Sequence, residues 1–247
     1  MITFSVITIT YNAADVLQPT LDSVLMQDFP TVEHIIVDGA STDNTVTIAE
    51  AYKEMSDSAE NEHVVRIYSE PDKGLYDAMN KGLVRAKGDY VVFLNAGDRF
   101  PTADTLEKVA LAAEVGDGEE RPAVVYGDTD IVDEKGIFLY QRRLQPPENL
   151  TWQSFRDGML VCHQAFYARL DIARKTPFDT RYRYSADVDW CIKIMREGER
   201  KGLLLRNVHA VVAHYMEEGQ TTKHHRASLR ERFQVMCKHY GLFSTLT

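Results

Sequence analysis

The residue types that could do chemistry in this chain gather where apolar segments end. The run Tyr90–Leu94 is followed at once by Asn95, Ala96, Gly97 and Asp98. A turn would explain such a stop, because Asn, Gly and Asp are common where strands end. A carboxylate in that place can also hold a divalent cation or a polar ligand at the edge of a sheet. Three further apolar segments end in comparable polar stretches, TYN, VDGASTDNT and SEPDKG.

A second candidate group is the acidic segment SADVDW, residues 185–190. Ser185 is suited to be the N-cap of a helix, which places Asp187 in the first turn. The helix dipole favours the ionised form of a carboxylate there, and an ionised carboxylate in reach of a hydroxyl group can act as a general base. Asp189 is the alternative base. Both acids would also be ordinary residues for the first turn of a helix.

Regularly alternating elements must position these residues. The segments FSVITIT, EHIIVDG, VVRIYS and YVVFL are short, apolar and rich in β-branched residues, and amphipathic helical patterns follow each of them. We expect the third of these helices to end at Gly88 as its C-cap. Such alternation predicts an α/β fold with a mostly parallel sheet flanked by helices. Ligands of such sheets bind outside the carboxyl ends of the strands, so four polar strand ends together predict a site.

The second half of the chain is less regular. DTDIVDEKGIFLYQRR predicts a hairpin around residues 134–136, and SADVDWCIKIMREG predicts a helix. We expect a pair of strands in GLLLRNVHAVVAHYM and a last helix after it. We find no internal repeat, and one α/β domain with a distinct C-terminal half is favoured over two independent domains.

Composition excludes several classes of protein. A net charge of −9 over 247 residues argues against general nucleic-acid binding, which needs a basic surface. No apolar run approaches the length of a membrane-spanning helix, and the first residues do not resemble a signal peptide. The three cysteines are scattered without a C-x-x-C pair, which is typical of a reduced cytoplasmic protein. We therefore expect a cytoplasmic chain.

Common nucleotide-binding motifs are absent, since the chain has neither G-x-x-x-x-G-K-[ST] nor G-x-G-x-x-G. GASTD comes near the G-x-S-x-G motif of serine hydrolases, with Asp43 in place of the last glycine. An esterase using Ser41 and one of the later histidines is thus one alternative. A glycosidase with two paired carboxylates is another.

Seven segments in order resemble the family 2 glycosyltransferases with the GT-A fold. They are SVITITYN, IIVDGASTDNT, SEPDKGLYDAMNKG, GDYVVFLNAGD, CHQAFYAR, YSADVDW and EEGQTT, which together span roughly residues 3 to 225. SEPDKGLYDAMNKG and FLNAGD are especially similar to the branch that builds bacterial exopolysaccharides such as colanic acid. The resemblance implies a single GT-A (Rossmann-like) domain over residues 1–247. Its parts would be a nucleotide-sugar-binding half (1–128), an acceptor-side half with the catalytic base (129–223) and a C-terminal helix (224–247).

The resemblance also implies a nucleotide-diphosphate sugar as donor, with UDP favoured over GDP. Thr10 and Tyr11 would pack the base, and an aromatic face suits stacking. Asp38 would accept a hydrogen bond from the base. The other residues expected on the donor are Ser41, Lys73, Asp77, Asn80 and Asn95.

For the reaction, the resemblance implies inversion with Asp187 as the base, although Ala186 stands where the family usually has Glu. The family's acidic D-x-D cluster is reduced here to Asp98, which would hold a divalent ion, Mn²⁺ or Mg²⁺. His214 is a weaker candidate ligand. His163 and Gln164 match a family segment near the donor sugar or the acceptor. Residues 217–222 resemble a loop that closes over the donor.

The expected acceptor is a saccharide or lipid-linked hydroxyl compound in surface polysaccharide synthesis. The tail carries four basic residues, Arg226, Arg230, Arg232 and Lys238, against the single acid Glu231. A weak contact with the inner face of the membrane through this helix is one expectation, and a solvated helix is the other. Because the acidic cluster is reduced, a catalytically silent module that only binds a sugar nucleotide is a further alternative.

Overall fold

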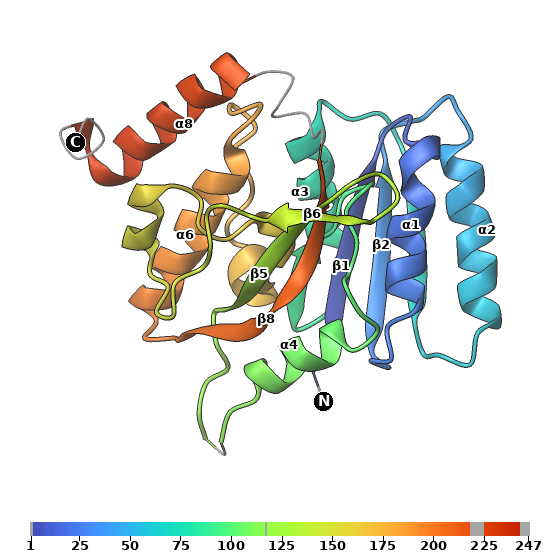
Figure 1. The fold of residues 1–247 in the computed structure, drawn as a ribbon, viewed down its shortest axis with the longest axis horizontal. Coiled ribbons are helices and arrows are strands. Elements are labelled where there is room, and N and C mark those ends of the chain that lie inside the picture. The colour runs from blue at the N-terminus through green and yellow to red at the C-terminus, as the bar shows by residue number, and fades with distance from the viewer. Residues whose placement is uncertain (1, 117, 218–224, 243–247) are drawn as a thin grey trace.

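The apolar run Phe4–Thr10 forms β1, and every one of its residues is buried because helices cover both faces of the sheet around it. The computed structural model describes residues 2–116, 118–217 and 225–242. Within them the strands form one mixed sheet in the order β3-β2-β1-β4-β7-β5-β6, with β8 on the other side of β5 (Figure 1).

The first half alternates as the sequence predicts. After β1 the elements are α1 (Ala14–Leu25), β2 (Val32–Asp38), α2 (Thr45–Ser58), β3 (Val64–Ser69), α3 (Leu75–Arg85), β4 (Tyr90–Phe93) and α4 (Thr105–Ala113). Strands β1 to β4 pair in parallel, so their carboxyl ends share one edge of the sheet. The polar stretches that follow β1, β2, β3 and β4 therefore meet at this edge.

Side-chain alternation along β2 explains how helices cover both faces. Ile36 packs with Leu17 of α1 and Tyr52 of α2 in one apolar cluster. Ile35 and Val37 face the other side and belong to the cluster that includes residues of α3. Gly82 of α3 lets this helix pack closely on the sheet, because a Cβ atom there would lie 2.5 Å from Ile7.

The second half adds antiparallel strands to the same sheet. Its elements are β5 (Val124–Val132), β6 (Phe138–Gln141), η1 (Trp152–Asp157), η2 (His163–Ala165), β7 (Phe166–Arg169), α5 (Leu170–Ala173), α6 (Ala186–Arg200), β8 (Leu205–Met216) and α8 (His225–Tyr240). β7 pairs antiparallel with both β4 and β5 and so joins the two halves. The predicted hairpin is confirmed, since β5 and β6 pair around the turn that contains Gly136.

Two local predictions were wrong. The third helix ends at Arg85, with Ala86 as its C-cap. Gly88 instead allows the chain to pack closely against β1, because a Cβ atom there would lie 2.7 Å from the backbone N of Ser5. The expected strand pair after residue 202 is one strand, β8, parallel to β5. The register between them shifts near His209, whose φ of 56° interrupts the regular strand.

The C-terminal helix α8 lies beside α6, on the side of the molecule away from α1 and α2 (Figure 1). Val235 of α8 is fully buried, so this helix packs on the body of the protein and is not solvated on all sides. Among the described residues, no helix is long and apolar enough to cross a membrane. All three cysteines are free thiols.

Candidate active site

The ends of β1 and β2 are tied together by short hydrogen bonds. The backbone N–H of Ser41 donates to the Asp38 carboxylate at 2.9 Å. The hydroxyl group of Ser41 also donates to this carboxylate. The hydroxyl of Ser69, at the end of β3, donates to the same carboxylate at 2.6 Å. The Ser41 hydroxyl in turn accepts from the backbone N–H of Asn12. Asp38, only 1% exposed, thus fixes three strand ends. Its predicted contact with a base stays a prediction.

Tyr11 is an exposed aromatic residue at this carboxyl edge of the sheet. Tyr11 is 64% exposed, whereas the neighbouring Thr10 is buried, and its hydroxyl group has no partner within the described part of the chain. Gly39 permits a close approach here, because a Cβ atom would lie 2.5 Å from the carboxylate of Asp72 and 3.2 Å from the ring of Tyr11. The loops after β1, β2 and β3 therefore lie next to one another.

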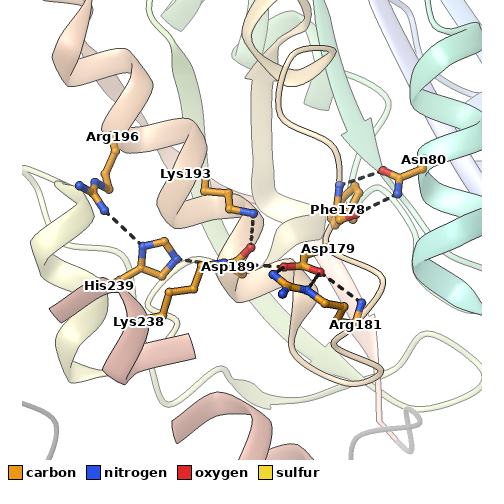
Figure 2. Close-up of polar contacts among 9 residues, drawn as sticks. All are labelled: Asn80, Phe178, Asp179, Arg181, Asp189, Lys193, Arg196, Lys238 and His239. Carbon is orange, nitrogen blue, oxygen red and sulfur yellow. Dashed lines mark hydrogen bonds and ion pairs between the residues drawn. The ribbon is translucent and has the colours of Figure 1, made fainter. Parts of the chain in front are cut away.

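The residues predicted on α3 have different surroundings. Lys73 is exposed and lies just before α3. Its backbone N–H donates at 3.1 Å to the carboxylate of Asp77, which lies in the first turn of this helix. Asn80 uses its amide to bond both backbone groups of Phe178, at 3.0 Å and 2.8 Å (Figure 2). Asn80 thereby fastens the segment before α6 to α3. The predicted donor contacts of these three residues stay predictions.

A chain of polar contacts runs from β4 to the start of α6. The amide Nδ2 of Asn95 lies 3.2 Å from Nε2 of His163, and Nδ1 of His163 lies 3.4 Å from Oδ2 of Asp187. The hydroxyl group of Tyr76 donates to Oδ1 of Asp187 at 3.0 Å. A proton on Nδ1 of His163 satisfies both of its contacts. Four residues from four different segments, the carboxylate of Asp187 among them, thus form one connected polar group.

Asp187 is held in its ionised form. Burial opposes ionisation, but the contacts with His163 and Tyr76 outweigh it, so that the pKa of Asp187 is below its ordinary value. The side chain keeps 17% exposure, which leaves it accessible to a substrate. Tyr76 was missed from the sequence. Its phenol has a pKa raised well above the ordinary value by burial and by Asp187, so it remains a hydrogen-bond donor.

Asp98 lies in the turn after β4, in which its backbone N–H donates to Asn95 at 2.9 Å. The stop after the apolar run is therefore a turn that also carries a buried carboxylate. Nε2 of Gln164 donates to the Asp98 carboxylate at 2.9 Å. The backbone N–H of Met216 donates to the same carboxylate at 3.3 Å. Burial raises the pKa of Asp98 to about 6 against the opposing effect of Gln164. The predicted pair His163 and Gln164 thus connects Asp187 with Asp98.

The oxygen atoms near Asp98 are of the type that a hard divalent ion prefers. Oδ1 of Asn95 is buried and has no hydrogen-bond partner among the residues that the structure describes, and the Asp98 carboxylate lies three residues further along the same turn. Within the described ranges no three His, Cys, Asp or Glu side chains group as a complete metal site. A metal ion shared with a diphosphate needs only one or two protein carboxylates, so these donors fit one.

His214 lies beside this turn through its backbone. It exchanges two backbone hydrogen bonds with Arg99, at 3.0 Å and 2.9 Å. Burial lowers the pKa of its imidazole, which favours the neutral form that binds metals. Its weak assignment as a ligand stays a prediction.

The alternative base, Asp189, faces away from this group. It is fully buried, and it contacts Lys193 at 2.5 Å, Lys238 at 2.7 Å and His239 at 2.8 Å (Figure 2). Two of these partners, Lys238 and His239, belong to α8, so Asp189 joins α6 to α8. Because its carboxylate is buried among these partners, it is not placed to contact a substrate. The loop at 217–222 lies, apart from Glu217, outside the described residues.

A serine hydrolase is not supported by the surroundings of Ser41. Its hydroxyl group donates to a carboxylate and accepts from a backbone N–H, and in the part of the chain that the structure describes no imidazole bonds to it. A nucleophilic serine needs an adjacent general base.

The carboxyl edge of the parallel strands carries an exposed aromatic ring, buried carboxylates and a chain of polar contacts, and ligands of α/β proteins bind at such an edge. The family model described as Glycosyl transferase family 2 matches residues 5–174. A PGL/p-HBAD biosynthesis glycosyltransferase of Mycobacterium tuberculosis is 37% identical over 224 residues, covering 87% of this chain and 77% of that protein. The chain belongs to glycosyl transferase family 2 and is a glycosyltransferase.

Solved structures show the same fold. S. aureus TarS 1-349 in complex with UDP-GlcNAc matches with a TM-score of 0.71 at 20% identity, over 94% of this chain and 64% of that one. The mannosyltransferase PcManGT from Pyrobaculum calidifontis, in complex with GDP-Man and Mn²⁺, matches with a TM-score of 0.68 at 19% identity, over 96% and 64%. The chain thus spans somewhat less than two thirds of each of these structures. The predicted GT-A fold is confirmed.

Proposed function

We propose that this glycosyltransferase moves a sugar, with inversion, from a nucleotide-diphosphate sugar to a hydroxyl group of a saccharide or lipid-linked acceptor. The observation that carries the proposal is the ionised Asp187, held by His163 and Tyr76 at the edge where the strand-end loops meet. The resemblance of SEPDKGLYDAMNKG and FLNAGD to exopolysaccharide enzymes supports a role in surface polysaccharide synthesis.

In this reaction Asp187 removes the proton from the acceptor hydroxyl as its oxygen attacks the anomeric carbon of the donor. The bond from oxygen to carbon forms on one face while the bond to the diphosphate breaks on the other, and the nucleoside diphosphate leaves. His163 and Tyr76 orient the two carboxylate oxygens before the acceptor arrives. Such preorganisation is what general-base catalysis needs.

The donor is proposed to lie across the ends of β1, β2 and β4. Tyr11 would stack on the base and Asp38 would accept from it, while Lys73 would face the diphosphate and Asn95 the sugar. The relatives described above include a complex with UDP-GlcNAc and one with GDP-Man. We favour UDP for this chain and keep GDP as the second choice.

A divalent ion, Mn²⁺ or Mg²⁺, is proposed as the cofactor, with Asp98 as the residue that would hold it and His214 as the weaker candidate. When bound, such an ion neutralises charge on the departing diphosphate. The Mn²⁺ in the PcManGT complex supports this choice. We place the reaction in the cytoplasm, with α8 in weak contact with the inner face of the membrane, since Leu229 and Phe233 are exposed beside Arg226 and Arg230.

The decisive experiment compares Asp187→Asn with the wild-type protein. We expect donor binding to be unchanged and the rate of transfer to fall about 100- to 10,000-fold, the usual contribution of a general base. Binding is measured by calorimetry with UDP-sugars and GDP-sugars, and transfer by release of nucleoside diphosphate with a panel of saccharide acceptors. Glu107→Gln, which changes another acid in the first turn of a helix, is the control.

Three outcomes would contradict parts of the proposal. Wild-type rates in Asp187→Asn would remove Asp187 as the base. A wild-type protein that binds donor but releases no nucleoside diphosphate with any acceptor would favour the silent binding module. Release of free sugar from a substrate without a nucleotide would favour a glycosidase.

A further inference from the structure

The turn that leads into α6 is not capped by its own side chain. Ser185 is the N-cap residue, but its hydroxyl group makes no capping bond to the helix. Instead it donates to the backbone carbonyl of Ser228 in α8, at 3.2 Å. The N-terminal backbone of a helix has donors that need partners, and here those just before the helix find theirs on α8.

Glu231 of α8 supplies these partners. Its carboxylate accepts three consecutive backbone N–H groups, from Arg183 at 2.9 Å, Tyr184 at 2.6 Å and Ser185 at 3.2 Å. The three residues immediately precede Ala186 and Asp187. Bonds from N–H groups to a charged carboxylate are stronger than neutral ones, so this contact fixes the path of the backbone at the start of α6.

α8 is positioned for this contact by its own buried face. Ser228, Glu231, Val235 and Lys238 recur every three or four residues and so lie on one side of the helix. Ser228 and Val235 are buried, and Lys238 contacts Asp189 one turn further along α6 (Figure 2). The ion pair and the Glu231 contact are separate connections between the same two helices.

We propose that Glu231 is a positioning residue for Asp187, holding the turn at 183–185 so that the carboxylate meets His163 and Tyr76. This inference rests on the proposed function of Asp187 as the base. The contact is specific in its direction, because the hydrogen bonds of Glu231 within the described residues go to the backbone before the helix and not to Asp187 itself. Its loss should therefore affect the chemical step and leave donor binding in place.

The test uses the full chain with Glu231→Ala, Glu231→Gln and the control Lys238→Ala. Lys238→Ala removes an ion pair between the same helices but leaves the three N–H bonds of the turn. Release of nucleoside diphosphate gives kcat and the KM for the donor. We expect Glu231→Ala to lower kcat about 10- to 100-fold, because small displacements of a catalytic group have effects of that size. The donor KM should change less than about twofold.

Glu231→Gln should be intermediate, since its amide oxygen can still accept part of the three bonds. Hydrogen exchange of the amides at 183–185 gives a second readout that does not depend on activity. Exchange should be faster in Glu231→Ala than in Lys238→Ala. Equal kcat values in the two alanine variants, or equal exchange, would overturn the positioning role and leave Glu231 as a general anchor of α8.

Failure of the proposed function is distinguishable from failure of this inference. A wild-type protein that is inactive with every donor would count against the proposed function alone, and the exchange measurement would still decide whether Glu231 holds the turn. An active wild type with an equally active Glu231→Ala would count against the inference alone.

Discussion

The surroundings of the two carboxylates of the site shift their pKa values in opposite directions. Asp187 has a lowered pKa because contacts with His163 and Tyr76 outweigh its burial. Asp98 has a pKa raised to about 6 because burial outweighs its contacts with Gln164 and Met216. The first carboxylate is therefore ready to accept a proton at neutral pH. The second is a buried charge that a cation would stabilise.

Asp98 should cost the free protein stability at neutral pH. The stabilising contribution of a raised pKa is fully present below the ordinary value of 3.8 and is lost as the pH rises through about 6. The difference corresponds to about 3 kcal/mol. In a chelating buffer we expect Asp98→Asn to be more stable than the wild type at about pH 8, and equally stable at about pH 4. Urea unfolding measures both.

The exposed Asp15→Asn controls for the loss of one negative charge in this comparison. A difference between Asp98→Asn and wild type that is the same at both pH values would show that hydrogen bonding, and not ionisation, separates the two proteins. Asp98→Asn should also lose metal-dependent binding of the donor, as proposed for a metal ligand.

At the scale of elements, the contact between α6 and α8 holds the helix that carries Asp187, the proposed base. Asp189 is the centre of their contact, and its pKa is lowered because the contacts with His239, Lys193 and Lys238 outweigh burial. Its stabilising contribution is therefore present above the ordinary carboxylate range and is lost as the pH falls below it. The charge of Lys238 is paired with Asp189, although the lysine side chain is partly exposed.

Asp189→Ala should separate α8 from α6. Removing one member of a buried ionic group leaves its partners uncompensated, which costs roughly 3 kcal/mol when, as here, the lysines are partly exposed. The free energy of unfolding from urea titrations gives the value. Hydrogen exchange should show the loss in α8 first. Asp57→Ala, which removes an exposed ion pair with Lys53, is the control and should change the free energy by less than about 1 kcal/mol. Unchanged stability in Asp189→Ala would mean that apolar contacts alone hold α8.

At the scale of the whole molecule, the proposed donor would span three strand ends, so its binding should stabilise the entire sheet. We expect the unfolding temperature to rise with UDP and Mn²⁺ or Mg²⁺, and to rise less with GDP. A ligand at 100 times its dissociation constant adds about 2.7 kcal/mol, and each kcal/mol raises the midpoint by roughly 2–4 °C for a chain of this length. Scanning calorimetry with each nucleotide, with and without metal, makes the comparison.

The control for this experiment is Tyr11→Ala, which removes the exposed ring without touching the core. It should reduce the rise caused by UDP. A rise that does not depend on metal would keep the donor site and remove Asp98 as a metal ligand. No rise with either nucleotide would contradict the proposed donor class.

Much of the fold was predictable because its signals are local. The strands and helices of the first half follow from periodicity within ten to fifteen residues, and their parallel pairing follows from the alternation itself. Two local signals misled. Gly88 suits a helix end, but close packing against Ser5 requires a glycine there for another reason. The sequence of β8 predicts two strands, but it forms a single strand whose regular backbone is interrupted at His209.

The sequence alone determined that polar residues follow four parallel strands and that an acid stands in the first turn of a later helix. The tertiary structure decided which of them meet. Asn95, His163 and Asp187 come together with Tyr76 only because β7 joins the two halves of the sheet. Glu231 reaches the turn before Asp187 only because α8 packs on α6. Contacts between segments so far apart leave no periodic pattern in the chain, and they depend on packing that forms when the whole core is assembled.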